Sequence, residues 1–227
     1  MIYLYLLLNL GSISIPLLYS FEKNMRFIKH WKAVLLSLTI VATVFLIWDA
    51  IFTKNGVWGF NPEYHLPFLV LGMPIEEWMF FFCIPYASVF IHYSLEYFKP
   101  NLLLSEKLTI AITISVIIIL IPVLLLNTEK AYTTVNYSFL IGILLVGFFY
   151  GIHYLRRFYI AFLIILIPFF IVNGILTGTG LPEPVVWYNN SENLGIRLGT
   201  IPVEDIGYAF TMLFANVFLI EKFKNRF

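Results

Sequence analysis

The stretch LTIAITISVIIILIPVLLL at residues 108–126 decides the fold class, because it contains no charged side chain from one end to the other. An α-helix needs about 20 consecutive apolar residues to cross the hydrocarbon core of a bilayer, which is about 30 Å thick. Comparable apolar stretches lie at 2–20, 33–53, 75–97, 132–150, 158–177 and 203–220. The sequence therefore predicts an all-α protein, a polytopic membrane bundle of seven transmembrane helices.

The overall composition favours the same class. Of the 227 residues, 60% are hydrophobic and only 12% are charged, whereas a soluble domain carries about 25% charged residues. The formal net charge is +1 without a basic stripe, which argues against a nucleic-acid partner. The single cysteine, Cys83, excludes an internal disulfide framework, and the absence of CxxC and HExxH patterns predicts no metal site.

The basic residues indicate how the helices are oriented. If successive spans cross the membrane in opposite directions, three of the 14 Lys and Arg residues lie on one side of the membrane and all others on the opposite side. The three are Lys54, Lys130 and Arg197. Cytoplasmic loops carry the excess of basic residues. The first span lacks the basic region and cleavage site of a signal peptide. We therefore expect an integral membrane protein with its N-terminus outside and its C-terminus in the cytoplasm. The expected location is a bacterial inner membrane.

The two halves of the chain resemble each other. The matching segments are WDAIFTKNG (48–56) with VNGILTGTG (172–180), and LGMPIEEWMFFF (71–82) with LGTIPVEDIGYAF (198–210). With one extra span between them, both halves have the same orientation and form parallel repeats. We expect a single membrane domain, 1–227, composed of repeat one (1–98), a linking helix (99–127) and repeat two (128–227).

Carboxyl side chains recur at matched positions of this duplication. Carboxylates inside a membrane are costly and are candidates for function by default. A proline followed by an acid in the first turn is also common at the start of ordinary helices. An acid within a span can instead form a buried hydrogen bond that holds two helices together. Because successive helical residues lie about 100° apart, one acid of a pair can cap its own helix while its neighbour faces the bundle. The candidate catalytic residues are Glu76, Glu77, Glu204, Asp205 and Asp49.

Aromatic side chains gather around the same acids. Such rings commonly form an interfacial belt or a packed core, but their faces can also stabilise a positive charge. A dry, ring-lined site with several carboxyls can protonate an alkene, hold the cation and remove a different proton. The candidate substrate-binding residues are Asn173, Trp48, Trp58, Phe60, Trp78, Phe81, Trp187 and Tyr208.

The stretch WDAIFTKNGVWGFNPEYHLPFLVLGMPIEEWMFFFCIPYASVF at 48–90 resembles the membrane-integral lycopene cyclases, the heterodimeric type in its fused form. The resemblance rests on FNPEY at 60–64 and PIEE at 74–77, and PVED at 202–205 is a diverged second copy. It implies redox-neutral cyclisation of the ψ-ends of lycopene to β-ionone rings, through γ-carotene to β-carotene. It also implies that no cofactor is needed; in agreement, no GxGxxG follows a strand.

The resemblance further implies that Glu76 and Glu77 are the signature acids, with Glu204 and Asp205 as their copies. We expect a carboxylic acid of one pair to protonate C2 of the substrate and a carboxylate of the other to remove the proton from C6. Which pair is the acid and which is the base stays open at this point. The implied partners are lycopene from the bilayer, membrane lipid and other enzymes of the carotenoid pathway.

Other functions remain as alternatives. A C50 carotenoid cyclase, an ε-cyclase or a hydratase would begin with the same protonation. A small membrane transporter would suit parallel repeats, although the polar groups crowd one face, and a membrane scaffold would leave the repeated acids without a purpose. A retinal photoreceptor needs a Schiff-base lysine in its last span, and residues 203–220 contain none. The oligomeric state is left open.

Overall fold

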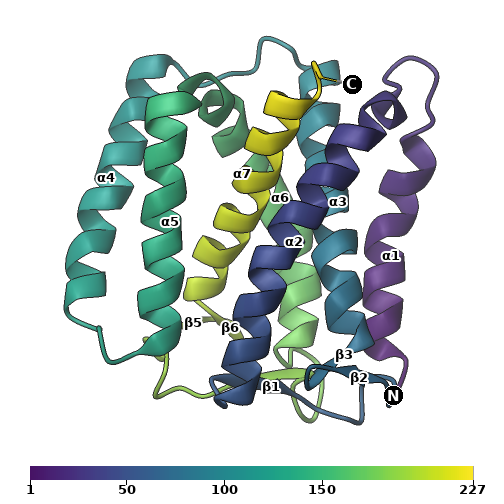
Figure 1. The fold of residues 1–227 in the computed structure, drawn as a ribbon, viewed down its shortest axis with the longest axis vertical. Helices are drawn as coiled ribbons and strands as arrows, with labels where there is room; N and C mark the ends of the chain where they lie inside the picture. The colour runs from purple at the N-terminus through teal and green to yellow at the C-terminus, as the bar shows by residue number, and fades with distance from the viewer. Residues whose placement is uncertain (227) are drawn as a thin grey trace.

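The computed structural model describes residues 1–226, and within them seven α-helices form one bundle (Figure 1). The helices are α1 (Leu4–Tyr19), α2 (Trp31–Lys54), α3 (Ile75–Phe98), α4 (Glu106–Leu125), α5 (Ala131–Tyr150), α6 (Ile152–Leu176) and α7 (Glu204–Phe223), with a short 3₁₀ helix, η1 (Phe27–His30), before α2. Each of the seven predicted spans corresponds to one of these helices. The chain is an all-α membrane helical bundle.

Six of the helices, α2 to α7, are long and apolar enough to cross a membrane. The helix α1 has 16 residues, which at 1.5 Å per residue makes it about 24 Å long. A seventh crossing, by α1, therefore stays a prediction.

One predicted boundary differs clearly from the structure. The helix α6 begins at Ile152, whereas the apolar pattern places its start at residue 158. The additional turn contains Arg156 and Arg157, whose side chains donate to backbone oxygens of Leu104 and Pro100. Because these contacts satisfy the guanidinium groups, the helix extends beyond its apolar run.

The helix α7 occupies the centre of the bundle. It lies between α2 and α5 (Figure 1) and packs on both. The helix α3 packs on α1, α2 and α6, while α4 packs on α5 and α6 at the edge of the bundle. Rings from α6 and α7 form much of the core, where Phe158 lies 5.0 Å from Phe210 and 5.1 Å from Phe214.

The two long loops, after α2 and after α6, meet at the end of the bundle where the N-terminus of the chain lies (Figure 1). Their strands are β1 (Trp58–Phe60), β2 (Leu69–Val70), β3 (Met73–Pro74), β4 (Val186–Tyr188), β5 (Arg197–Leu198) and β6 (Ile201–Pro202). Strands β1 and β4 pair antiparallel, with Trp58 opposite Tyr188, and thereby join the two halves. Each half also has a small hairpin, β2–β3 or β5–β6, directly before the helix that carries its paired acids.

Candidate functional site

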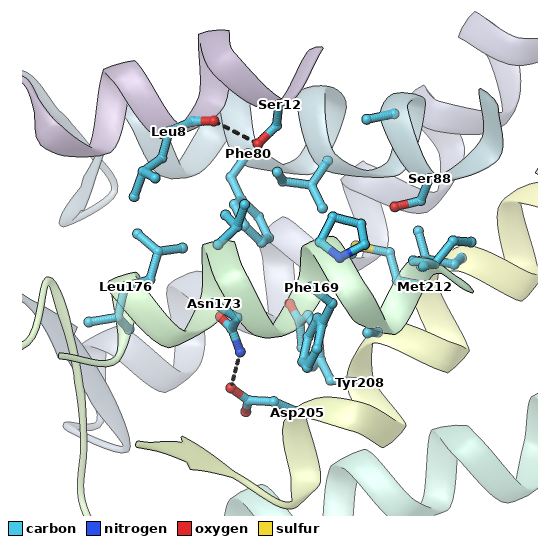
Figure 2. Close-up of a pocket in the computed structure, with 18 of the residues that line it drawn as sticks. Leu8, Ser12, Phe80, Ser88, Phe169, Asn173, Leu176, Asp205, Tyr208 and Met212 are labelled. Atoms are coloured by element: carbon cyan, nitrogen blue, oxygen red, sulfur yellow. Dashed lines mark hydrogen bonds between the residues drawn. The ribbon is translucent and has the colours of Figure 1, made fainter. Parts of the chain in front are cut away.

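A cavity of about 550 Å³ opens inside the bundle, close to the strands. Helices from both halves line it, chiefly α1, α3, α6 and α7, together with β1 and β4. Its walls are mostly apolar, but three carboxyl groups belong to them: Asp49, Glu77 and Asp205. A volume of this size is typical of a small-molecule site. Figure 2 shows Leu8 and Ser12 on α1 on one side of this space, and Asn173 on α6 and Asp205 on α7 on the other.

In the first half, two carboxyl groups lie next to each other. Glu77 accepts a hydrogen bond from the hydroxyl of Tyr5. Oδ1 of Asp49 accepts one from Nε1 of Trp58 at 2.5 Å, while its buried Oδ2 has no partner among the described residues. Both side chains are buried and close enough for each to act on the other's charge. The pair thus receives one neutral donor for each carboxyl group.

In the second half, a single carboxyl group receives three donors. Oδ1 of Asp205 accepts from the hydroxyl of Tyr132 at 2.5 Å. Oδ2 accepts from Nδ2 of Asn173 at 2.8 Å and from the hydroxyl of Tyr188 at 3.1 Å, and Figure 2 draws the bond from Asn173. An amide therefore takes the place that the second carboxyl, Asp49, has in the first half.

Tyr188 lies in β4, outside the helices. Burial, and secondly the nearby Asp205 carboxylate, raise the pKa of its phenol well above the ordinary value. The phenol therefore keeps its proton and serves as a hydrogen-bond donor to Asp205.

The other two predicted acids, Glu76 and Glu204, do not line the cavity. Oε1 of Glu76 accepts from the backbone N–H of Leu66 at 2.8 Å. Oε1 of Glu204 accepts from the backbone N–H of Leu194 and from the hydroxyl of Thr133, both at 2.7 Å. Both side chains are fully buried. In each half, then, the first acid fixes a loop and its neighbour faces the cavity, as the 100° rotation between them allows.

The predicted substrate-binding residues divide in the same way. Asn173, Trp58, Phe60 and Tyr208 line the cavity. Trp48 and Phe81 are buried in the core behind it.

The remaining two tryptophans lie elsewhere. Nε1 of Trp78 donates to the backbone oxygen of Val70 at 3.2 Å, and Trp187 is 42% exposed with its ring against the backbone of Gly59. The structure therefore brings half of the predicted set to the cavity.

Trp58 connects the two acid clusters. Its Nε1 binds Asp49, and its ring lies 5.1 Å from that of Tyr132 and 6.0 Å from that of Tyr188. These two tyrosines are the donors to Asp205. Trp58 thus binds the acid of one half directly and packs on the tyrosines that bind the acid of the other half, and all of these groups line one cavity.

Tyr5 and Tyr132 are site residues that the reasoning from sequence missed, and Tyr188 lies outside the predicted substrate-binding set. A signal for the first two exists in the sequence: YLLLN at 5–9 matches YTTVN at 132–136. Both asparagines have the same role, since Asn9 donates to the backbone oxygen of Glu76 at 2.8 Å and Asn136 to that of Glu204 at 2.6 Å. Extending the repeat to α1 and α5 would have identified both tyrosines.

The fold and the cavity define a class: a bundle of membrane-type helices around a mostly apolar cavity that has three carboxyl groups in its walls. Within residues 1–226, no cluster of three or more His, Cys, Asp or Glu residues could hold a metal ion. The sequence model of the lycopene cyclase family matches residues 2–95 and 129–223. The chain belongs to the lycopene cyclase family, which supports a general role in carotenoid cyclisation. Searches of curated proteins and of solved structures gave no match.

Proposed function

We propose that this protein cyclises the ψ-ends of lycopene to β-ionone rings, giving γ-carotene and then β-carotene in a redox-neutral, proton-initiated reaction. The observation that carries the proposal is the meeting of Asp49, Glu77 and Asp205 at one apolar cavity. The first two belong to one half of the chain and the third to the other. Their different hydrogen-bond partners suit an acid and a base.

The proton donor in this proposal is the Asp49–Glu77 pair. Two ionised carboxylates side by side in an apolar site repel each other and lose their hydration. Within residues 1–226, two neutral donors, from Tyr5 and Trp58, offset that cost. The pair is therefore most stable with a single proton on its two carboxyl groups. That proton is the one transferred to the substrate.

The base is Asp205. Three donors on one carboxyl group favour its ionised form, and these come from Tyr132, Asn173 and Tyr188. Two buried groups in different surroundings thus take opposite roles.

The steps balance in atoms and charge. The Asp49–Glu77 pair gives its proton to C2 of the terminal double bond, which leaves a cation at C1. The C5=C6 bond attacks C1, so that the C1–C6 bond forms and the positive charge moves to C5. Asp205 then takes the proton from C6, and the C5=C6 double bond of the β ring is restored. Return of this proton to the pair completes the cycle.

The rings at the cavity support the charged intermediate. Trp58, Phe60 and Tyr208 belong to its lining, and aromatic faces attract a cation within about 6 Å. Their apolar surroundings also keep water from capturing the cation, which would give a hydrated product in place of a ring.

The site also fits a membrane substrate. Lycopene is about as long as the hydrocarbon core is thick, about 30 Å, and it can reach the cavity sideways from the lipid. In the proposed topology the acid clusters face the outer leaflet, with the N-terminus outside and the C-terminus in the cytoplasm of a bacterial cell. Lipid and the enzyme that supplies lycopene are the proposed partners.

Expression in a host that accumulates lycopene tests the proposal. The expected result is a shift from lycopene to β-carotene, identified by chromatography and mass. An unchanged lycopene content would contradict the proposal. An ε ring would instead place the lost proton at C4, and a hydrated chain would mean that water captures the C1 cation.

A further inference from the structure

The contacts of the two halves allow their positions to be matched along α1 and α5 and along α2 and α6. Tyr5 and Tyr132 donate to the cavity-facing acids of their own halves, which fixes the register of α1 against α5. Asp49 and Asn173 occupy matched places next to those acids, which fixes α2 against α6. These equivalences support the duplication.

The matching makes an unequal pair of positions visible. Ser12 lies as far beyond Tyr5 as Phe139 lies beyond Tyr132. Val172 directly precedes Asn173, as Trp48 directly precedes Asp49. Small side chains on α1 and α6 thus correspond to large rings on α5 and α2.

On the α1–α6 side, the small residues border open space. Ser12 lies on α1 and Val172 on α6, and Val172 belongs to the cavity lining together with Ser12. A Cβ atom added to the neighbouring Gly11 would meet nothing within 4 Å. The lining follows α1 from Tyr5 to Pro16, about 16 Å at 1.5 Å per residue. Figure 2 shows Leu8 and Ser12 of α1 across this space from Phe169 and Asn173 of α6.

On the α2–α5 side, rings fill the corresponding place. The ring of Phe139 stacks on that of Trp48, with 5.3 Å between centroids and 24° between planes. Trp48 is only 6% exposed, whereas Phe139 is 41% exposed on the outer surface. Trp48 in turn packs on Tyr208 at 5.0 Å. Between α2 and α5, stacked rings therefore run from Phe139 at the surface through Trp48 to Tyr208 of α7.

We propose that the bundle has a single lateral portal for the polyene, between α1 and α6 past Ser12 and Val172, and that the Trp48–Phe139 stack closes its counterpart. This inference rests on the proposed function. One end of lycopene reaches Asp49, Glu77 and Asp205, while the rest of the chain leaves between α1 and α6 into the lipid. Because only one end can enter at a time, the monocyclic product must leave and turn round before its second end reacts.

A thiol placed at the portal and blocked after folding tests the proposal. The chain contains one cysteine, Cys83 in α3, which does not line the cavity. In a Cys83→Ser background, Ser12→Cys is a small change, and pyrene maleimide then adds a bulky group in the folded protein. The matched control is Ser14→Cys, an exposed position of the same helix outside the cavity lining.

The readout is the initial rate of cyclisation in proteoliposomes loaded with lycopene, with the labelled fraction measured by mass. We expect labelling at position 12 to lower the rate about 100-fold, the loss that a misplaced substrate already causes, and labelling at position 14 to leave it unchanged. Lycopene should also slow the labelling of position 12. Protein fully labelled at position 12 that keeps its rate would overturn the portal.

A second variant decides the matter if position 12 does not react. Ser12→Phe with Val172→Trp copies the closed side onto the open side, and we expect the same loss of rate with an unchanged unfolding temperature. If the double variant does not fold, Ser12→Phe alone is measured in its place. Either variant, if it folds and keeps the parent rate, would overturn the inference. Failure of the proposed function looks different, because the parent protein itself would then form no cyclic product.

Discussion

The two neighbouring acids of α3 allow a direct test of the proposed chemistry. Glu77→Gln removes a proton-bearing group from the cavity but keeps the size of the side chain and an oxygen that can accept from Tyr5. Glu76→Gln makes the same chemical change one residue away, where Oε1 accepts from the backbone N–H of Leu66. The two variants therefore separate loss of a carboxyl group that faces the cavity from loss of a buried carboxyl group that binds a loop.

The expected sizes differ for physical reasons. General acid catalysis contributes about 10²–10⁴-fold, which corresponds to about 3–5 kcal/mol of activation free energy at about 1.4 kcal/mol per tenfold. Glu77→Gln should therefore retain about 1% of the parent rate or less, with Asp49 as the remaining acid. Glu76→Gln weakens one buried hydrogen bond, which costs about 1 kcal/mol of folding free energy, and it should keep most of the activity.

The assay is the initial rate of ring formation by purified protein in lycopene-loaded proteoliposomes, with the unfolding temperature recorded for each variant. Parent-level activity of Glu77→Gln would refute the role of this carboxyl as proton donor. Equal inactivation of folded Glu76→Gln would refute the division of labour between the two neighbours.

Three further predictions concern the second half. Asp205→Asn removes the base and should lower the rate about 10²–10⁴-fold, while Glu204→Gln, the matched change beside it, should mainly lower the unfolding temperature; similar rates for both folded variants would contradict this. Asn173→Asp gives the second half the acid–acid arrangement of Asp49 and Glu77, so the ionised form of Asp205 loses a donor and gains a like charge, and the initial rate should fall; an unchanged rate would speak against Asp205 as the base. Tyr132→Phe leaves a buried acceptor without one of its donors and should cost about 1–3 kcal/mol of stability, seen as a lower unfolding temperature; a fully stable variant would show that this hydrogen bond contributes nothing.

The membrane class and the helix positions follow from the sequence because they depend on local composition. The apolar run at 108–126 suffices for α4, and the other spans follow in the same way. The start of α6 could not be predicted from local composition, because contacts of Arg156 and Arg157 with the loop before α4 stabilise its first residues. Those contacts join residues far apart in the chain.

The sequence indicated which residue types belong to the site and at which end of the helices they lie. It did not indicate which of these side chains point into the cavity. The predicted repeat places four acids at one end of the bundle. Which acid of each pair faces the cavity depends, however, on the rotation of α3 and α7. Contacts from Asn9 and Asn136 to the first residues of these helices accompany that rotation. No local pattern encodes it.

The aromatic residues show the same limit. Trp58 and Trp48 are equally plausible as cavity walls from their spacing, but only Trp58 reaches the cavity, because β1 pairs with β4 of the other half. Trp48 instead packs beneath Phe139 of α5. Contacts between segments far apart in the chain therefore determine which aromatic rings line the cavity.

The central claim is that carboxyl groups of the two halves act from one cavity on one end of a polyene. A structure of the Glu77→Gln variant with lycopene bound tests it most directly, since this variant should bind the substrate and turn it over slowly. The account predicts C2 of one end beside Asp49 and residue 77, and C6 within about 3.5 Å of Asp205, the reach of a reacting pair. An end group bound away from these side chains, with none of the three carboxyl positions in contact, would contradict it.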